Sequence, residues 1–441
     1  MALYSRPRSG AAGVSRRKFQ IFGWLAWPLA AASWLWLGHS AQAEPLQSLT
    51  LPQFLAEVEQ RSPVLAGRRS ELRAAMERPA QAGAMEDPML MLELWQVPFR
   101  QEQLPLMATL RQPVPWPGKL RARAKVMEQE PARARAEVAD TARGLKVEAT
   151  RAYFEHRLAI RSAEVLRELQ RLLNSIVSAV EIRYRVGRAE LAELLKAQTE
   201  SASLDSLLLD TDRERDLAAT AMNQLLARES DAPVAFPITA PEVRTLPPLA
   251  KLLTLASSQR PELRSAEAAL LQAQAREHAA SVEQAPDLAV WASYMASLRG
   301  TMEQTFTVGV QSSIPSFSLV KSRAAAREAQ AQASAQRAIL QQVAARVGAE
   351  VRQAVLRIET VERHLQLHSQ TLLPTEERAV RAAQVSYQNG KISLALLLDA
   401  VRGLLSHRLE YERFLAEYGQ RIAELEAAVG SPIPADERRT P

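Results

Sequence analysis

The sequence predicts a mainly α-helical protein with two β-hairpins, in which one helix–hairpin–helix unit occurs twice. Three observations predict this fold class. A Tyr-x-x-Gly motif at 184–187 returns at 387–390, and leucines follow both copies at the same spacing. The long segments before these motifs carry core positions three and four residues apart over many turns, which is typical of antiparallel coiled-coil helices. Shorter segments alternate apolar and polar residues, as β-strands do.

Residues 1–43 predict an export signal peptide. They contain five basic and no acidic residues, and they run from Arg16-Arg17-Lys18 through an apolar stretch to Ala41-Gln-Ala43. A basic region, an apolar core and a small-x-small cleavage site form the layout of a bacterial secretory signal. Two alternatives stay open at this point: an uncleaved anchor, and twin-arginine export through the Ser-Arg-Arg-Lys-Phe pattern at 15–19.

Removal of this leader would remove most of the positive charge. Of 55 Lys and Arg in the full chain, 50 would remain against 49 Asp and Glu, so composition gives little support to a nucleic-acid partner. The chain has no cysteine, which excludes disulfides and thiolate metal sites. No hydrolytic, phosphate-binding or nucleotide-binding motif is present, and we expect neither an enzyme nor a bound cofactor.

The first repeat covers residues 44–232. Thr50 and Gln53 form a capping-box pattern that opens its first helix, and we expect Pro79 and Gly83 to end this helix. The following elements are a β-hairpin (88–114), a long helix (119–185), a tip (184–195) and a helix to 229. A proline-rich linker is predicted over 233–248.

The second repeat, residues 249–430, has the same order of elements. They are a helix, a β-hairpin (287–314), a long helix (318–386), a tip (387–399) and a helix to 429, followed by a C-terminal tail (431–441). In the second hairpin, Phe306, Val308 and Val310 alternate with polar residues, which predicts one apolar and one polar face. Gly187 and Gly390 suit the left-handed position that ends a helix.

The hairpins have the length of membrane strands. About 9–11 residues cross a bilayer as a tilted strand. Unpaired backbone groups in lipid cost several kcal/mol each, so a membrane sheet has to close on itself. Four strands are too few for this, because single-chain barrels begin at about eight. We therefore expect several chains to share one barrel, with Trp95, Trp116 and Trp291 as rings at the membrane interface. The alternative is a soluble β-lid with these rings in its core.

The export signal, the duplicated unit, the Tyr-x-x-Gly tips and the Pro-Trp-Pro-Gly-Lys turn at 115–119 together resemble the TolC-like outer-membrane efflux channels. The resemblance covers nearly all of the chain after residue 43, and the turn is most similar to the branch that serves heavy-metal and related cation pumps. The family implies a homotrimer in the outer membrane. Three chains would form a 12-stranded transmembrane β-barrel and a periplasmic α-barrel of long helices.

The resemblance also implies partners and a gate. The partners are a periplasmic adaptor, a proton-driven inner-membrane efflux pump and outer-membrane lipid, and the chain itself is a passive exit duct. Acidic side chains of the family constrict the periplasmic entrance, and Asp399 and Glu193 match their positions. In the family a tyrosine and an arginine clasp the acid of the first tip. Tyr387 matches the tyrosine, but Ile392 stands at the arginine position, which leaves Lys391 or Arg188 as substitutes.

A gate at Asp399 has a physical basis. Three copies of this carboxylate around one axis would form a ring that attracts cations. The alternative is that Asp399 and Glu193 are solvated acids near helix starts, where the helix dipole favours them.

Three other interpretations stay open. His364 and His368 stand one helical turn apart, a spacing that suits a metal ion, but packing is favoured because no third ligand is near in sequence. Met85, Met89, Met91 and Met107 gather around the first hairpin, where contact with lipid or neighbours is favoured over Cu(I) binding. A periplasmic adaptor or an exported coiled-coil scaffold are the alternative functions.

Overall fold

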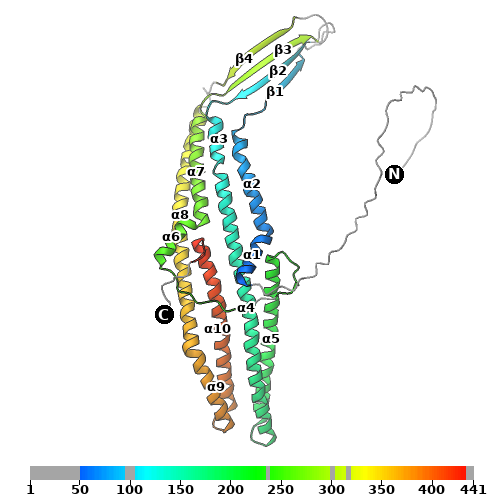
Figure 1. Ribbon diagram of the computed structural model, residues 1–441, viewed down its shortest axis with the longest axis vertical. Coiled ribbons are helices and arrows are strands. Elements are labelled where there is room, and N and C mark those ends of the chain that lie inside the picture. Colours follow the sequence, from blue (N-terminus) through cyan, green and yellow to red (C-terminus); the bar gives the residue numbers. More distant parts are fainter. Residues whose placement is uncertain (1–49, 95–104, 235–238, 298–302, 314–318, 434–441) are drawn as a thin grey trace, which may run out of the picture. The chain divides into compact units, whose positions relative to one another are not determined.

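The computed structural model describes residues 50–94, 105–234, 239–297, 303–313 and 319–433. The predicted signal peptide, Trp95, part of the linker and most of the C-terminal tail lie outside these ranges. The described part consists of long helices and one four-stranded antiparallel sheet, which confirms the predicted fold class (Figure 1). Among the described helices, none combines the length and the apolar character that a membrane crossing requires.

The two predicted hairpins join into a single sheet with the strand order β1–β2–β3–β4. The strands are β1 (Met89–Leu94), β2 (Pro105–Val114), β3 (Leu288–Ser297) and β4 (Thr305–Ser312). β2 of the first repeat pairs with β3 of the second repeat over its whole length, from Pro105 opposite Ser297 to Val114 opposite Leu288. The repeats are therefore joined by backbone hydrogen bonds, and β1 and β4 are the edge strands of the described sheet.

The register gives the sheet two different faces, because directly opposite residues in antiparallel strands share a face. One face is apolar except for Gln112 and Ser312 at its end and the hydroxyl of Tyr294. Its other residues are Leu90, Leu92 and Leu94 of β1, Leu106, Ala108, Leu110 and Val114 of β2, Leu288, Val290, Ala292 and Ala296 of β3, and Phe306, Val308 and Val310 of β4. The opposite face carries polar residues, including Glu93, Thr109, Arg111, Ser293, Thr305, Thr307 and Gln311. The apolar face is open in the single chain: Val310 is 70% and Phe306 69% exposed.

Each repeat opens with two helices instead of the one expected. They are α1 (Leu51–Arg61) and α2 (Pro63–Gly83) in the first repeat, and α6 (Leu249–Gln259) and α7 (Pro261–Val282) in the second. The break precedes a proline in both, at Ser62 and Arg260, whose backbones are extended. A proline disfavours the helical conformation of the residue before it and is itself well placed at a helix start. The expectation that Pro79 ends the first helix is wrong, since Pro79 lies inside α2.

The long helices are also interrupted before prolines. The first repeat has α3 (Lys119–Met127), α4 (Glu130–Arg185) and α5 (Leu191–Leu225), with Pro131 in the first turn of α4. The second has α8 (Leu319–Leu367), a π-helical turn η1 (His368–Leu372), α9 (Leu373–Gln388) and α10 (Leu394–Val429), with Pro374 in the first turn of α9. Each long helix was expected to be continuous, and sequence periodicity alone does not reveal such breaks.

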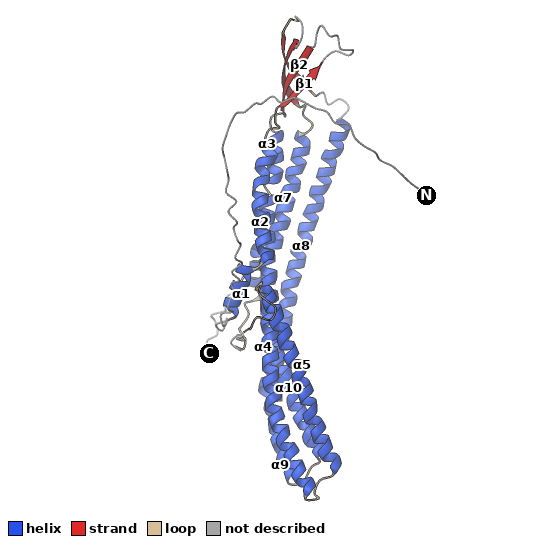
Figure 2. Cartoon of the chain, turned by 90° about the vertical axis from the view of Figure 1, so that its right-hand side faces the viewer, coloured by secondary structure: helices blue, strands red, loops and turns tan. Residues whose placement is uncertain are grey.

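The core runs along the seams between these helices. α4 packs against α5, α10, α2 and α7, and α8 packs against α7 and α10 (Figure 2). Equivalent seam positions of the two repeats are buried in pairs that lie 202 residues apart, each residue at most 6% exposed. The pairs are Ala149 and Val351, Ala152 and Ala354, His156 and Ile358, Ala159 and Val361, Ala163 and Leu365, and Leu166 and His368.

Candidate functional site at the helix tips

Both helix tips end in the same hydrogen-bonded turn. Gly187 and Gly390 have φ of +70° and +71°, a left-handed conformation that glycine adopts without strain. The amide of each following residue reaches back to a helix carbonyl, from Arg188 N to Arg183 O and from Lys391 N to Ser386 O, at 2.8 Å. This six-to-one bond is the Schellman motif, which satisfies carbonyls left free at a helix end. The next helices, α5 and α10, then return along α4 and α9.

Arg183 joins the two tips of one chain. It lies in the last turn of α4, and its Nη1 donates a hydrogen bond of 2.6 Å to the backbone oxygen of Tyr387 in α9. Its guanidinium also lies over the Tyr387 ring, 4.6 Å from the centroid. A cation over an aromatic face is attracted by the ring quadrupole. One arginine of the first tip therefore contacts both the backbone and the side chain of the second tip.

Tyr387 is the buried member of this contact. It is 3% exposed and belongs to the apolar core shared by α4, α5, α9 and α10. Its hydroxyl is buried and, among the described residues, has no hydrogen-bond partner of good geometry. Burial and, to a smaller extent, the negative charge of Glu193 raise the pKa of the Tyr387 hydroxyl. Tyr387 and Glu193 are thus close within one chain, as the family pattern requires.

Asp399 belongs to a second charged group. Its carboxylate lies in α10, is 65% exposed, and pairs with Arg402 one turn later at 3.2 Å. Arg402 continues to Glu200 of α5, with Nε 3.0 Å from Oε2. The hydrogen bond from Arg402 lowers the pKa of the Glu200 carboxyl. These three residues form a line of alternating charge from α5 to α10 that leaves Asp399 accessible to solvent.

The other candidate residues stay apart from these groups. Lys391 and Arg188 are exposed, and neither side chain forms an ion pair with any residue that the structure describes. Tyr184, the repeat equivalent of Tyr387, is 40% exposed instead of buried. The structure therefore brings together Glu193 and Tyr387, but the nearby arginine is Arg183 and not one of the expected substitutes.

Sequence reasoning missed Arg183 and Arg402. Arg183 corresponds to Ser386 in the second tip, so it breaks the similarity of the two copies at the residue before each tyrosine. This difference is a weak signal, because Arg185 and Val186 also differ from their counterparts Gln388 and Asn389. Arg402 follows Asp399 by one helical turn, a spacing that predicts an ion pair on a helix surface. Its contact with Glu200 depends on how α5 and α10 meet, which the sequence does not state.

The Pro-Trp-Pro-Gly-Lys turn lies next to the sheet, and its last two residues, Gly118 and Lys119, have structural roles there. Gly118 has a φ of +100°, so the turn depends on glycine before α3. Lys119 is 2% exposed, and its Nζ lies 2.8 Å from Oδ1 of Asp287, the residue before β3. An ion pair therefore connects the start of α3 in one repeat with the start of β3 in the other. Trp116 in the same turn is exposed.

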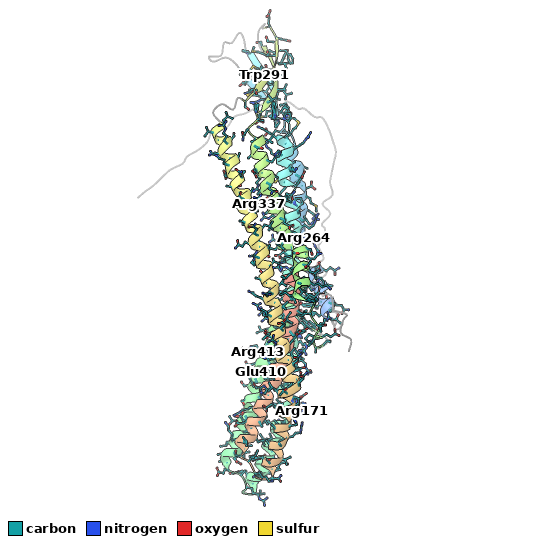
Figure 3. The ribbon with its side chains drawn as sticks, turned by 90° about the vertical axis from the view of Figure 1, so that its left-hand side faces the viewer. Arg171, Arg264, Trp291, Arg337, Glu410 and Arg413 are labelled. Atoms are coloured by element: carbon teal, nitrogen blue, oxygen red, sulfur yellow. The ribbon has the colours of Figure 1, made fainter. Side chains whose placement is uncertain are left out.

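Trp291 shares its face of the sheet with polar residues. Figure 3 labels this residue at the sheet. In the register it is opposite Gly309 and Arg111. A Cβ added to Gly309 would come within 2.5 Å of the indole, so this glycine makes room for the ring. Met89, Met91 and Met107 share the polar face of the sheet, so the side chains of Met89 and Met91 point the same way, as expected. Trp95 lies outside the described residues.

The sequence matches a family model described as outer membrane efflux protein over residues 55–228 and 252–431, one segment in each repeat. The comparison with curated proteins gave no match. VceC of Vibrio cholerae, an outer membrane protein, is 18% identical, with a TM-score of 0.74 over 86% of this chain and 96% of that chain. The open state of the MtrE channel of Neisseria gonorrhoeae is 17% identical, with a TM-score of 0.72 over 88% and 91%. CusC is 18% identical, with a TM-score of 0.75 over 87% and 93%. At this identity the likeness shows the fold.

Proposed function

Because the chain belongs to the outer membrane efflux protein family, we propose that it is the exit duct of a tripartite efflux system and that its helix tips form the periplasmic gate. The protein is an outer-membrane efflux channel with a long helical part in the periplasm. Neither the structure nor the comparisons favour the alternatives of an adaptor or a coiled-coil scaffold. A channel of this kind is a passive duct, so the energy for transport comes from its partners.

The observation that carries the proposal is the two-faced sheet. Four strands of one chain expose a continuous apolar face and end in edge strands β1 and β4. Lipid accepts such an apolar face but not an open edge. A homotrimer resolves this, because β4 of one chain can pair with β1 of the next and close a barrel of twelve strands. The apolar face then meets lipid, and the polar face with Thr307, Arg111 and Glu93 lines the water-filled interior.

The threefold symmetry also suggests where the partner proteins bind. Three copies of each tip would meet around the threefold axis at the periplasmic end of the helices. We infer that a periplasmic adaptor contacts these tips and that a proton-driven inner-membrane pump delivers the substrate. The substrate class remains a prediction: the Pro-Trp-Pro-Gly-Lys turn favours metal cations, because it resembles the turn of the cation-efflux branch.

In the proposed gate, Asp399 provides negative charge at the entrance, and Arg183 keeps the tips in the closed arrangement. The exposed Asp399 carboxylates of three chains would form a cation-attracting ring. The contact of Arg183 with Tyr387, next to Glu193, holds the first and second tips of each chain together. Separation of the tips would widen the entrance and require this contact to break.

The gate is tested by single-channel recording in planar bilayers. We expect Asp399→Ala to raise the conductance or to reduce the preference for cations, because the charged constriction is lost. Asp210→Ala is the matched control, since Asp210 is an exposed carboxylate of α5 that pairs within its own helix. Conductance and selectivity equal to those of the wild type would refute the gate role of Asp399.

Cell fractionation tests the duct itself. We expect a heat-modifiable oligomer in detergent extracts of outer membranes. Release of the protein by osmotic shock, without detergent, would contradict both the duct and the shared barrel.

A further inference from the structure

Three titratable side chains gather where the second long helix is interrupted. His368 lies at the start of the π-helical turn η1, and His407 and Glu410 lie one turn apart on α10 (Figure 3, Glu410). One ligand atom of each residue lies within 4.8 Å of those of the other two. The Glu410 carboxylate oxygen Oε2 is 3.1 Å from His368 Nε2 and 3.5 Å from His407 Nδ1. The carboxylate is therefore already close to both imidazole rings.

Neighbouring groups orient both imidazole rings toward the Glu410 carboxylate. His368 Nδ1 lies 2.8 Å from the backbone oxygen of His364, and its Nε2 faces the Glu410 carboxylate. His407 Nε2 faces Glu376 of α9 at 3.8 Å, which leaves its Nδ1 on the side of Glu410. Gly403 admits Glu376, because a Cβ at this glycine would lie 3.1 Å from Glu376 Oε2. Metal-binding histidines commonly donate their second ring nitrogen to a carbonyl or a carboxylate in this way.

The equivalent region of the first repeat has leucines in place of the two histidines and the glutamate. His368 corresponds to Leu166 along the seam, and both are buried. Counted from the tip glycines, His407 and Glu410 correspond to Leu204 and Leu207. Leu204 is buried like Leu166 and packs in the same apolar cluster. Leucine satisfies helix packing at this position in the first repeat, so packing alone does not require two histidines and a glutamate in the second.

The π-helical turn η1 accounts for one extra residue in the second repeat. Seam residues up to His368 follow their counterparts by 202 residues, whereas Tyr387 and Gly390 follow theirs by 203. A π-helical turn holds one residue more than an α-helical turn, and η1 covers His368–Leu372, within this interval. The extra residue thus falls at the histidine cluster. Single π-helical turns occur frequently at functional sites.

We propose that His368, His407 and Glu410 bind a divalent transition-metal ion of the Zn²⁺ type. Two imidazoles and one carboxylate are a ligand set that Zn²⁺ accepts, with solvent as the fourth ligand. Bonds of about 2.0–2.2 Å to a tetrahedral ion place the ligand atoms about 3.5 Å apart. The distances from the Glu410 oxygen to His368 and to His407, 3.1 and 3.5 Å, are already close to this spacing. Rotation of the two histidine side chains would bring their nitrogens to the same spacing and complete the site. The His364–His368 pair is not this site, because His364 stacks on Phe414 with a centroid distance of 4.6 Å.

A bound cation would join η1 to α10 and thereby fix the hairpin that carries the second tip. This inference does not depend on the proposed gate.

Titration of the purified full-length protein in detergent, after removal of metals by chelation, tests the site. We expect one Zn²⁺ per chain by calorimetry, and visible absorption of bound Co²⁺ typical of a four-coordinate site. His407→Leu copies Leu204 of the first repeat and should fold, yet bind Zn²⁺ at least about 100-fold more weakly. Glu410→Gln provides a second variant with little change in volume. His364→Leu is the matched control and should bind like the wild type.

Each outcome decides the proposal. No stoichiometric Zn²⁺ binding by the wild type overturns it, whatever the variants do. Binding that survives in folded His407→Leu and Glu410→Gln, or that is lost in His364→Leu alone, places the ion elsewhere and overturns it as well. Loss in the two cluster variants with retention in the control supports it.

Discussion

Arg183 shows at the scale of single residues how one side chain couples parts of the chain that are 204 residues apart. It combines a hydrogen bond to the Tyr387 carbonyl with a cation–π contact to the ring. Both interactions need the guanidinium, because lysine has no planar fork to serve a carbonyl and a ring together. The coupling of the two tips therefore depends on this residue type and not only on its charge.

Substitution of Arg183 tests this coupling. We expect Arg183→Ala to weaken the contact between the tips by about 1–3 kcal/mol, the usual range for a charged hydrogen bond. A loss of about 1–3 kcal/mol should make hydrogen exchange of the amides around residues 385–395 about 5–150-fold faster. Arg185→Ala is the control, because Arg185 is exposed and pairs with Glu181 of its own helix. Equal exchange in the two variants would contradict the coupling role.

The backbone turns at the two tips have the same geometry. Gly187 and Gly390 have nearly the same φ, and the backbone bonds of both turns agree in length. A Cβ at either glycine would meet no atom within 4 Å. The requirement for glycine is therefore conformational and not steric, since other residues pay for a left-handed backbone.

A comparison of glycine substitutions tests this at the level of the element. Gly187→Ala and Gly390→Ala should each lower the free energy of unfolding by about 1–2 kcal/mol through backbone strain. Gly144→Ala should act in the opposite direction, by about 0.5–1 kcal/mol, because Gly144 lies inside α4 and alanine favours a helix. Thermal unfolding followed by circular dichroism gives the three shifts. A shift of the same sign in all three variants would rule out the conformational explanation.

The whole molecule is organised by its apolar sheet face. In the single chain this face is exposed across all four strands. A soluble protein rarely leaves such a patch uncovered. In the proposed trimer lipid covers it, so the faces of the sheet should differ sharply in their tolerance of charge.

Two neighbouring residues of β4 allow a matched test. Val308 belongs to the apolar face and Thr307 to the polar face. Val308→Arg should destabilise the inserted barrel by up to about 2–4 kcal/mol per chain, the cost of a charge facing lipid near the bilayer midplane. Thr307→Arg should be tolerated, since its side chain faces water. The yield of heat-modifiable oligomer in outer membranes measures both, and equal yields would contradict the assignment of the faces.

The sequence by itself determined the duplication, the strands, the seam positions and the turn glycines. These features depend on short-range rules: periodicity of 2 or about 3.5 residues, the exclusion of non-glycine residues from left-handed turns, and the burial of apolar side chains. The predicted closeness of Glu193 to Tyr387 came from a family pattern on the same tips. The seam prediction included His368, whose burial followed from spacing alone.

Only the tertiary structure decided which distant groups meet. Arg183 reaches Tyr387 and Lys119 reaches Asp287 because helices and strands of the two repeats lie side by side. His368 reaches Glu410 because η1 and α10 of the second repeat pack together. The face of Trp291 was fixed by strand register, and the π-helical turn by one residue in excess over the first repeat. Such contacts join residues far apart in the chain, where no local propensity acts, and small differences between two similar halves select them.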